Sequence, residues 1–574
     1  MRGMAPILFL STLAVPAMTQ DAAPTTAPAP SVEAVLRCVP DDAHLVLVVP
    51  SLDGLVAGVA AFGRAIGSAD MGDVKAADLL GPWVGPAVAG LDPQGPVVLV
   101  LSADCDEPLL LARTGPGDSW TATTQPVVRE GATLYDFGPN HCVATTRGEV
   151  VVFAREQREL RRALDASGRR AARLANELRP LWGQDQAALW VDVPGWRSRI
   201  DVQTTALWRG MQVGMATAGP DAEIGLPIWN WMLEQFKRTL ADAATATVGL
   251  RVGGDGLQLD ARLTFQADTA AVRYLAQVRR PERDLLRGLA AGPAPLVLAY
   301  EWEDSVPGSG LSDALARVIA GMDSIKQKVG PEKLRAVMQM SAEVNRKIPG
   351  CNAAFSLCPD GPGLLYWGLY LTTEGPAVQA EMRHICELTP ELVGAWGTFP
   401  AAMKRGAVET IAGVETDVYE FTFGSDESAL EPLMPAIYGH NPTLYMAPHR
   451  EGVAYAFGPR EHARERLAGL LAPDAAPLAR DARVAAARRL LAPNPQGCLL
   501  LDLPALAATA TTMLAQLGAP VPRFEPPATD AALIGLSWYL EPQAVRAQLH
   551  VPAAPLKTLV RYAERIDKSD GGGY

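Results

Sequence analysis

The residues of this 574-residue chain that could do chemistry are scattered, and none forms a pattern that a named reaction requires. Asp192 and Asp502 occupy matching positions at the ends of two apolar runs, and paired carboxylates can serve as general acid and base. An aspartate at such a position more often caps a following helix or holds a turn, so we interpret both as structural. Ser312, in GSGLS, lacks the spacing of a nucleophile elbow and fits a helix cap instead. The sequence therefore predicts no catalytic residue.

Metal and cofactor motifs are equally unsupported by the sequence. Only His440, His449 and His462 lie near one another, without the helical spacing of a zinc protease motif, and we interpret them as surface or packing residues. Asp41 and Asp42 lack the alternating oxygen ligands of a calcium loop. The stretch GPWVGPAVAG lacks the glycine spacing of a dinucleotide-binding loop. We therefore expect no metal and no cofactor.

Tryptophan is the one residue type with an unusual distribution. Six of the twelve tryptophans fall between residues 182 and 231, so this stretch is the first place to look for a binding surface. Apolar residues at its end recur at helical spacing and form one stripe: Ile228, Trp229, Met232, Leu233, Phe236 and Leu240. Such a helix could close over an apolar pocket or rest on a membrane surface, but we favour a core helix with tryptophan at its rim. If the segment binds an apolar ligand, the expected contacts are Trp208, Ile228, Trp229, Trp231, Met232 and Phe236.

Composition limits the partners and the compartment. The net charge is 51 − 63 = −12 without a long run of either sign, so the clustered cations of a nucleic-acid-binding protein are missing. The seven cysteines include no C-x-x-C pair, which disfavours zinc ribbons and thioredoxin-type redox motifs. Cys351 and Cys358 lie at the two ends of an expected strand, beyond disulfide reach, and we expect buried free thiols.

The first twenty residues predict a secretory signal. Arg2 is followed by an apolar stretch that runs to about Val15, and small residues lead to a cleavage position after Ala17 or a few residues later. Residues 21–31 form a Pro/Ala/Thr linker. No later stretch reaches the roughly 20 apolar residues that a membrane-spanning helix needs. We therefore expect an exported protein, periplasmic or extracellular, without a transmembrane segment.

Four apolar runs each stand at the start of a segment of the chain, and these segments must position the candidate residues named above. They are HLVLVVPSL from His44, ALWVDVPGW from Ala188, PLVLAYEW from Pro295 and CLLLDLPAL from Cys498. Near-continuous apolar runs are typical of strands covered on both faces. Three of the runs end in proline, at Pro50, Pro194 and Pro504, whereas the third run has Glu301 after Tyr300. Proline ends a strand and suits the first turn of a helix, so we expect a helix after each run.

The sequence also contains an internal repeat, in which one hairpin pattern occurs twice. VGLRVGGDGLQLDARLTF from Val248, which alternates apolar and polar residues around a glycine turn, returns as IGLSWYLEPQAVRAQLHV from Ile534. We expect two hairpins that are each packed on one side only. Their polar residues, including Arg546, Gln548 and His550, should then face outward.

The spacing of the two copies locates an insertion. Asp192 matches Asp502 at 310 residues and Val248 matches Ile534 at 286, so the first copy carries 310 − 286 = 24 extra residues, at about 211–240. We expect an α+β fold of two tandem similar halves, each an antiparallel-rich sheet with helices packed on one face. The halves are 32–285 and 286–567, their quarters are about 40–180, 185–280, 294–472 and 495–566, and 568–574 is a flexible tail.

A short motif adds a resemblance to a known family. Pro40-Asp41-Asp42-Ala43 leads into an apolar strand after a signal peptide and linker, and this arrangement resembles a family of exported bacterial proteins with strand–helix–hairpin repeats. That family carries only a domain-of-unknown-function label. The resemblance covers most of the mature chain, implies an extracytoplasmic α+β repeat protein, and supplies no catalytic residues.

These patterns favour a binding or scaffold protein of the bacterial cell envelope that does not catalyse a reaction. Two alternatives stay open: a carrier of an apolar ligand or lipid that uses residues 211–240, and an extracytoplasmic hydrolase whose residues meet only in the fold. A convergent trio of titratable groups would favour the hydrolase, whereas an apolar pocket beneath the insertion would favour the carrier. A partner protein of the envelope is a further expectation.

Overall fold

The four apolar runs form strands, as their composition predicts. In the computed structural model they are β1 (Ala43–Val49), β8 (Ala187–Asp192), β11 (Leu296–Glu301) and β19 (Gly497–Leu501). Each of three runs leads into a helix: α3 (Leu52–Ile66), α8 (Val193–Ala216) and α18 (Leu503–Gln516). The first turn of α3 is capped by Ser51, whose side chain accepts a 3.1 Å hydrogen bond from the Gly54 backbone.

The structure describes residues 30–102, 108–115, 126–129, 132–136, 143–182, 185–216, 222–278, 281–292, 294–301, 330–358, 363–395, 401–423, 438–439, 441–474, 476–516, 521–525 and 532–570. The predicted signal sequence and nearly all of the predicted linker lie outside these residues. So do Ser312 with its loop, His440, Cys105 and Cys142.

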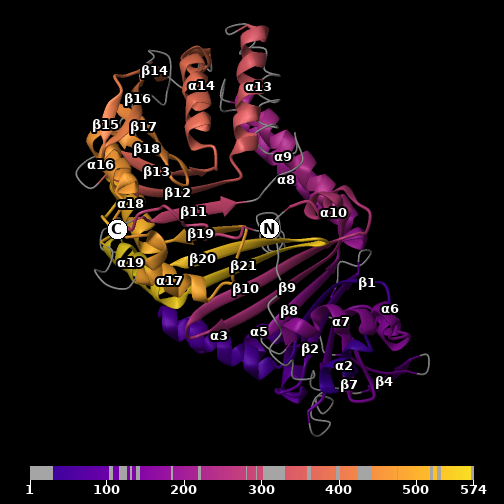
Figure 1. Ribbon diagram of the computed structural model, residues 1–574. Coiled ribbons are helices and arrows are strands. Elements are labelled where there is room, and N and C mark those ends of the chain that lie inside the picture. Colours follow the sequence, from indigo (N-terminus) through magenta and orange to yellow (C-terminus); the bar gives the residue numbers. More distant parts are fainter. Residues whose placement is uncertain are drawn as a thin grey trace. The chain divides into compact units, whose positions relative to one another are not determined.

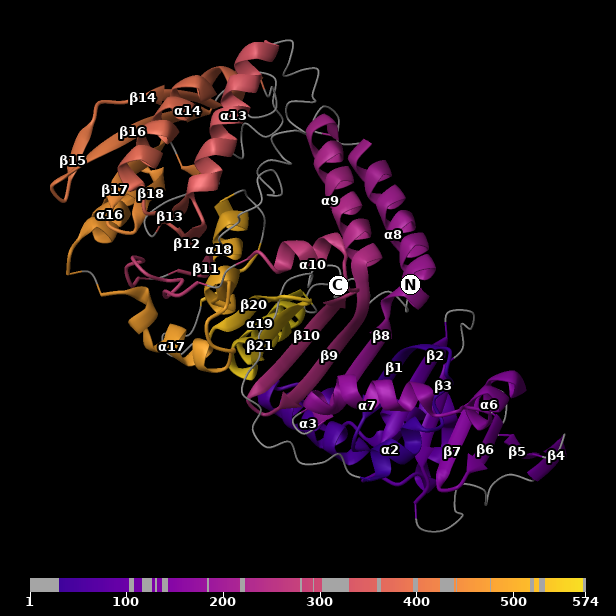
Figure 2. The same ribbon diagram turned by 45° about the vertical axis from the view of Figure 1, so that its right-hand side comes forward.

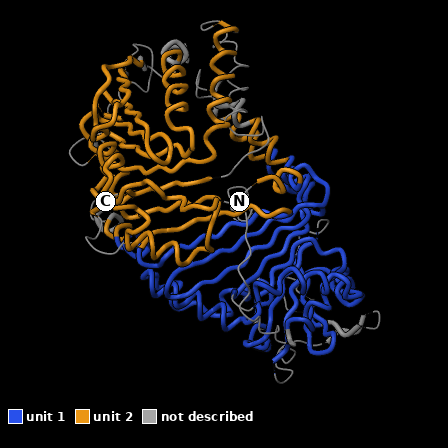
Figure 3. The backbone as a smooth tube through the Cα atoms, viewed as in Figure 1, with its two compact units in different colours: residues 1–205, 238–272, 543–561 blue, residues 206–237, 273–542, 562–574 orange. Residues whose placement is uncertain are grey.

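The chain divides into two compact units, and each collects several segments (Figure 3). Unit 1 comprises residues 1–205, 238–272 and 543–561, and unit 2 comprises 206–237, 273–542 and 562–574. Residues 206–237, from the first predicted half, thus belong to unit 2, and residues 543–561, from the second, belong to unit 1.

The strands of unit 1 form one antiparallel ladder (Figure 1). Besides β1 and β8 they are β2 (Val97–Ser102), β3 (Leu109–Arg113), β4 (Pro126–Arg129), β5 (Ala132–Asp136), β6 (Val143–Arg147), β7 (Val150–Ala154), β9 (Ala243–Gly253), β10 (Gly256–Phe265) and β21 (Ala544–Pro552). Their order is β4-β5-β6-β7-β3-β2-β1-β8-β9-β10-β21.

Unit 2 repeats this order from β5 to β9. Besides β11 and β19 its strands are β12 (Gly350–Leu357), β13 (Leu364–Leu371), β14 (Ala401–Arg405), β15 (Glu409–Ile411), β16 (Val414–Phe423), β17 (Pro442–His449), β18 (Gly452–Pro459) and β20 (Ile534–Glu541). The order β16-β17-β18-β13-β12-β11-β19-β20 corresponds to β5-β6-β7-β3-β2-β1-β8-β9, while β14 and β15 both pair with β16. The α+β class and the two similar antiparallel-rich halves are confirmed.

Strand register corrects the spacing of the two copies. β8 pairs Ala187 with Leu250, and β19 pairs Gly497 with Trp538. Because Gly497 lies 310 residues after Ala187, Trp538 is the counterpart of Leu250, a spacing of 538 − 250 = 288. The sequence match, at 286, is therefore two residues off, and the insertion is 310 − 288 = 22 residues long. A shift of two leaves every side chain on the same face of its strand, so the predicted pattern hid the error.

Helices cover both faces of these sheets, as the continuous apolar runs predicted, and not one face alone. The shorter elements of the first copy are α2 (Pro30–Leu36), α4 (Ala69–Gly72), α5 (Ala76–Val84), the 3₁₀ helix η1 (Gly85–Gly90), α6 (Gln157–Leu164), α7 (Arg169–Trp182) and α10 (Ala270–Leu275). In unit 1, α2, α6 and α7 pack on one side of the central strands, and α3, α5 and η1 on the other.

The second copy has its own two helical layers. Its helices are α13 (Pro331–Lys347), α14 (Gly375–Ala395), α16 (Arg460–Leu471), η4 (Leu478–Arg480), α17 (Ala482–Arg489) and α19 (Ala553–Asp570). In unit 2, α16 and α17 cover one face of the sheet, and α13 and α14 the other. Since α19 runs to Asp570, the first three residues of the predicted tail, 568–570, are helical.

Two further expectations concern thiols and membranes. The described cysteines, Cys38, Cys351, Cys358, Cys386 and Cys498, are all free. Within the described ranges, no helix combines the length and the apolarity that crossing a membrane requires.

Candidate functional site

The tryptophan-rich insertion forms two long helices. They are α8 and α9 (Ala222–Asp242), which run side by side in both views of the ribbon (Figures 1 and 2). α8 follows β8 just as α18 follows β19, so the scaffold of the two copies is the same up to this point. The parts of α8 and α9 between residues 206 and 237 belong to unit 2.

The predicted ligand contacts lie on these helices, and none of those whose burial is described is buried. Trp208 on α8 and Trp231 and Phe236 on α9 are half-buried, and Met232 is 46% exposed. In residues 197–213 and 230–242, where burial is described throughout, no residue is buried.

For the described members of the stripe, the favoured interpretation as a core helix is therefore wrong. Leu233 and Leu240, the remaining described members of the stripe, are only half-buried. Ile228 and Trp229 lie within α9, but their side chains fall outside the described set. Helical periodicity reports which side chains share a face and not whether another element covers that face.

Exposed apolar side chains concentrate on the same two helices. On α8, Val202 and Val213 are each 69% exposed and Leu207 is 39% exposed, and on α9 Met232 adds a fourth. Nine large apolar side chains are exposed among the described residues, and these four make α8 and α9 the richest location. Leu207, Val213 and Met232 all belong to unit 2.

The polar face of β9, β10 and β21, in unit 1, is a second candidate. Pairing places Arg251 opposite Gln258, and Gln258 opposite His550. The prediction that the polar residues of this hairpin face outward to solvent is wrong. Gln548 is 5% exposed, His550 is 9% exposed, and the side chain of Arg546 is 19% exposed. Period-two alternation identified the face correctly, but it carries no information on what lies against it.

The two aspartates on this face, Asp260 and Asp185, differ in how closely they are paired with arginine. Arg546 binds Asp260 through two nitrogens, and Gln548 Nε2 donates a 2.9 Å hydrogen bond to the same carboxylate. Asp185 has a weaker partner: its Oδ1 lies 3.6 Å from an Arg251 nitrogen. Burial raises the pKa of Asp185 to about 6; Arg251 opposes this shift, and the negative charge of Asp260 adds to it.

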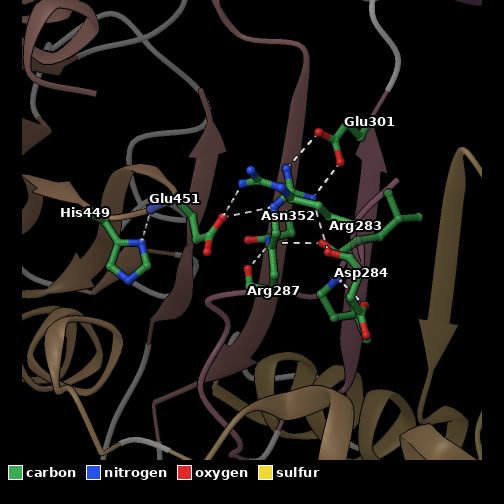
Figure 4. A network of polar contacts seen from close by, with 9 residues as sticks. Arg283, Asp284, Arg287, Glu301, Asn352, His449 and Glu451 are labelled. Carbon is green, nitrogen blue, oxygen red and sulfur yellow. Dashed lines mark hydrogen bonds and ion pairs between the residues drawn. The ribbon is translucent and has the colours of Figure 1, made fainter. Parts of the chain in front are cut away.

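A third candidate is the polar network around Arg287 in unit 2 (Figure 4). Two nitrogens of Arg287 donate to the two carboxylate oxygens of Glu301 at 2.6 and 2.7 Å, and its Nε donates to Glu451 at 3.1 Å. Arg283 lies 3.6 Å from Glu451. Asn352, which is fully buried, donates to the backbone oxygens of Leu285 and Arg287.

At the equivalent positions, the first copy of the repeat has apolar residues and lacks the polar side chains of this network. β1 pairs Val48 with Val98, and β11 pairs Ala299 with Asn352, so Asn352 is the counterpart of Val98. Glu301 stands two residues after Ala299, where the first copy has Pro50 two residues after Val48. The departure from proline that the sequence showed at this strand thus marks an ion-pair network.

The Arg287 network is best interpreted as a structural clamp. Two arginines face two glutamates, so the charges cancel within the network. Its central guanidinium is mostly buried, and the bidentate pair with Glu301 is the strongest geometry for such a contact. The clamp fixes the segment that contains Leu285, Leu286 and Leu289, all of which are core residues.

The aspartates that the sequence singled out are structural, as expected. Asp502 accepts hydrogen bonds from Arg483 at 2.9 Å and from the Ala505 backbone at 3.0 Å, which caps α18. Asp192 lies 3.6 Å from Arg170. Each aspartate therefore pairs with an arginine from the helix that precedes its strand.

Of the three histidines that the sequence places near one another, the structure describes His449 and His462. His449 ends β17, and its Nδ1 accepts a 3.1 Å hydrogen bond from the Glu451 backbone. Burial lowers the pKa of His449, and the charge of Arg450 lowers it further, which favours the neutral ring. His462 lies on α16. Throughout the part of the chain that the structure describes, no three His, Cys, Asp or Glu side chains are grouped to hold a metal ion.

Comparison with known proteins yields only weak neighbours. No family model matches the chain, and no curated protein matches it. Among solved structures, "Structure of crystal form I of TP0453" is 14% identical with a TM-score of 0.23, and the match covers 44% of this chain and 88% of that one. Crystal form III of the same protein gives 13% identity, a TM-score of 0.22, and coverage of 43% and 88%.

Proposed function

We propose that this is an exported, non-catalytic binding protein of the cell envelope, and that α8 and α9 carry its surface for an apolar partner. The observation that carries the proposal is the exposure of Leu207, Val213 and Met232 on adjoining helices. Burying a large apolar side chain gains about 1.5–3 kcal/mol, so a partner that covers three of them gains a useful affinity.

Lipid is the partner class that these helices suit best. Trp208 and Trp231 are half-buried among exposed apolar residues, and tryptophan favours a boundary between apolar and aqueous surroundings. Arg209 on α8 and Lys237 on α9 add positive charge near them. An amphipathic surface of this kind binds at the lipid headgroup level without spanning the bilayer.

Three carboxylates favour a structural role over a catalytic one. Asp192, Asp502 and Glu301 each have an arginine partner within 3.6 Å, which holds them as ion pairs. Proton transfer to a substrate requires a carboxyl group that can leave such a pair. Export rests on the apolar amino-terminal stretch of the sequence.

A flotation assay tests the proposal. The full chain is mixed with phosphatidylcholine vesicles, and the floated fraction is compared with that of the variant L207S/V213S/M232S. We expect at least a tenfold loss of vesicle binding, because each removed contact is worth about 1 kcal/mol or more. The matched control is V408S/L490S, which alters two apolar residues that are 46% and 48% exposed elsewhere in unit 2.

Three outcomes would contradict the proposal. The wild-type protein could fail to float, the triple variant could float like the wild type, or the control could lose as much binding as the triple variant. Hydrolysis of a generic ester or amide panel by the purified protein would favour the hydrolase alternative instead.

A further inference from the structure

A buried carboxylate marks the place where the end of α7 meets the hairpin β9–β10. The side chain of Asp185 is 9% exposed and lies directly over Gly249 of β9. A Cβ atom at Gly249 would stand 2.2 Å from Asp185 Oδ2, so only glycine at this position leaves room for the carboxylate. Leu181, near the end of α7, approaches the same glycine.

The next residue holds the strands together independently. Gln186 accepts a 2.6 Å hydrogen bond from the Val252 backbone and donates one of 2.8 Å to the Val252 carbonyl. The pairing of β8 with β9 therefore does not depend on Asp185. A change in the charge of Asp185 therefore acts on the contact of Leu181 and Asp185 with Gly249 of β9.

The groups that face Asp185 balance its charge incompletely. Arg251 on β9 contributes one contact at 3.6 Å, but its side chain is 42% exposed, and it also donates to Gln258 at 3.5 Å. Asp260 on β10 repels Asp185, while Arg546 on β21 attracts it and is already engaged with Asp260. His550 is on the same face of β21.

We propose that Asp185 is a proton-binding switch, which docks the end of α7 on β9 when it is protonated and loosens that contact when it is ionised. The carboxyl group packs in its site as a neutral group, because a buried charge without a close partner is costly. Ionisation draws the carboxylate toward water and Arg251. The contacts that respond are those of Leu181 and Asp185 with Gly249, since Gln186 keeps β8 in place.

The direction of the pH dependence follows from the pKa. Asp185 has a pKa of about 6 in the folded protein, against 3.8 for an unperturbed aspartate, so the folded state binds the proton more tightly. The stabilisation is fully present below about pH 4 and is lost as the pH rises through about 6. The corresponding change in the folding equilibrium approaches two orders of magnitude.

The switch is tested on the full chain between pH 4.5 and 8. Thermal unfolding and hydrogen exchange of residues 181–190 and 245–253, corrected for intrinsic exchange, are measured for the wild type, D185N and D255N. We expect the wild type to lose protection as the pH rises through about 6, and D185N to stay protected throughout. D255N, an exposed aspartate in the turn of the same hairpin, should follow the wild type.

Two further variants separate Asp185 from its neighbours. R251Q should move the midpoint to higher pH, because Arg251 lowers the pKa of Asp185. H550Q should keep the transition, because the histidine is not its source. The proposal fails if D185N retains the wild-type pH profile, if R251Q moves the midpoint down, or if H550Q abolishes the transition.

Discussion

At the scale of single residues, the Arg287 network and the site of Asp185 differ in how completely their buried charges are compensated. Arg287 makes close contacts with Glu301 and Glu451, and hydrogen bonds and attraction from these carboxylates outweigh burial and raise its pKa. Asp185 has one long contact, and burial dominates its pKa. Close partners thus produce a permanent ion pair, whereas a distant partner leaves a group that can titrate near neutral pH.

Removing the arginine from the first cluster should be costly. We expect R287M to lower the free energy of unfolding by on the order of 3 kcal/mol, because it leaves Glu301 and Glu451 without their main partner in a mostly buried site. Chemical denaturation monitored by tryptophan fluorescence measures this change. R283M is the control, because Arg283 is 69% exposed and should contribute less than about 1 kcal/mol. Equal effects of the two substitutions would contradict the clamp.

At the scale of elements, α8 and α9 are additions to a repeat that otherwise preserves its strand order. In residues 206–213 and 230–237, where burial is described, no residue is buried, so these parts of α8 and α9 contribute little to a hydrophobic core. In the second copy, the connection from α18 to β20 is 22 residues shorter than the connection from α8 to β9 in the first copy. This difference follows from the register of the flanking strands (310 − 288). The insertion therefore serves contacts outside the scaffold more than the scaffold itself.

Excision of the insertion should leave the scaffold folded. Replacing residues 206–237 with a short Gly/Ser bridge should preserve a cooperative melt with a Tm within about 5 °C of the wild type, since little apolar area is lost from the core. Differential scanning calorimetry and analytical gel filtration measure the outcome. Aggregation or a non-cooperative melt would show that the helices are part of the core after all.

At the scale of the whole molecule, the two copies of the repeat meet in a strand pair of matching residues. Within unit 1, β10 of the first copy pairs antiparallel with β21 of the second, and Asp260 faces Gln548. These two residues are counterparts, because they lie 548 − 260 = 288 residues apart, the spacing that the register of β8 and β9 defines. The ladder is thus symmetric about this pair, like the contact between two identical strands.

A glycine permits the close approach of these two strands. Gly256 has φ = 143°, and a Cβ there would stand 2.3 Å from the Val551 carbonyl oxygen. We expect G256A to lower the free energy of unfolding by about 2 kcal/mol or more, because it adds backbone strain and a clash with β21. G254A in the same turn meets nothing within 4 Å and should change stability by less than about 1 kcal/mol. Urea denaturation of both variants measures these free energies of unfolding. A G256A variant as stable as G254A would contradict the close packing of β10 and β21.

The sequence by itself determined the local structure of this protein. The runs that became β1, β8, β11 and β19, the hairpin β9–β10 and the matched copies could all be predicted, because apolar periodicity and turn residues are properties of short stretches of chain. The same patterns placed Asp192 and Asp502 as structural residues. The insertion was located to within a few residues, and its length was two residues too long because a strand pattern repeats every two residues.

Only the tertiary structure decided which faces are covered and which charges meet. The stripe on α9 was expected in the core, and none of its described members is buried. The polar face with Gln548 and His550 was expected in water, and both of these residues are buried. Arg546 and Asp260 form an ion pair across 286 residues of sequence, and Asp185 gains its shifted pKa from burial over Gly249. Burial and charge pairing depend on residues that are distant along the chain and adjacent in space, so no short pattern in the sequence contains them.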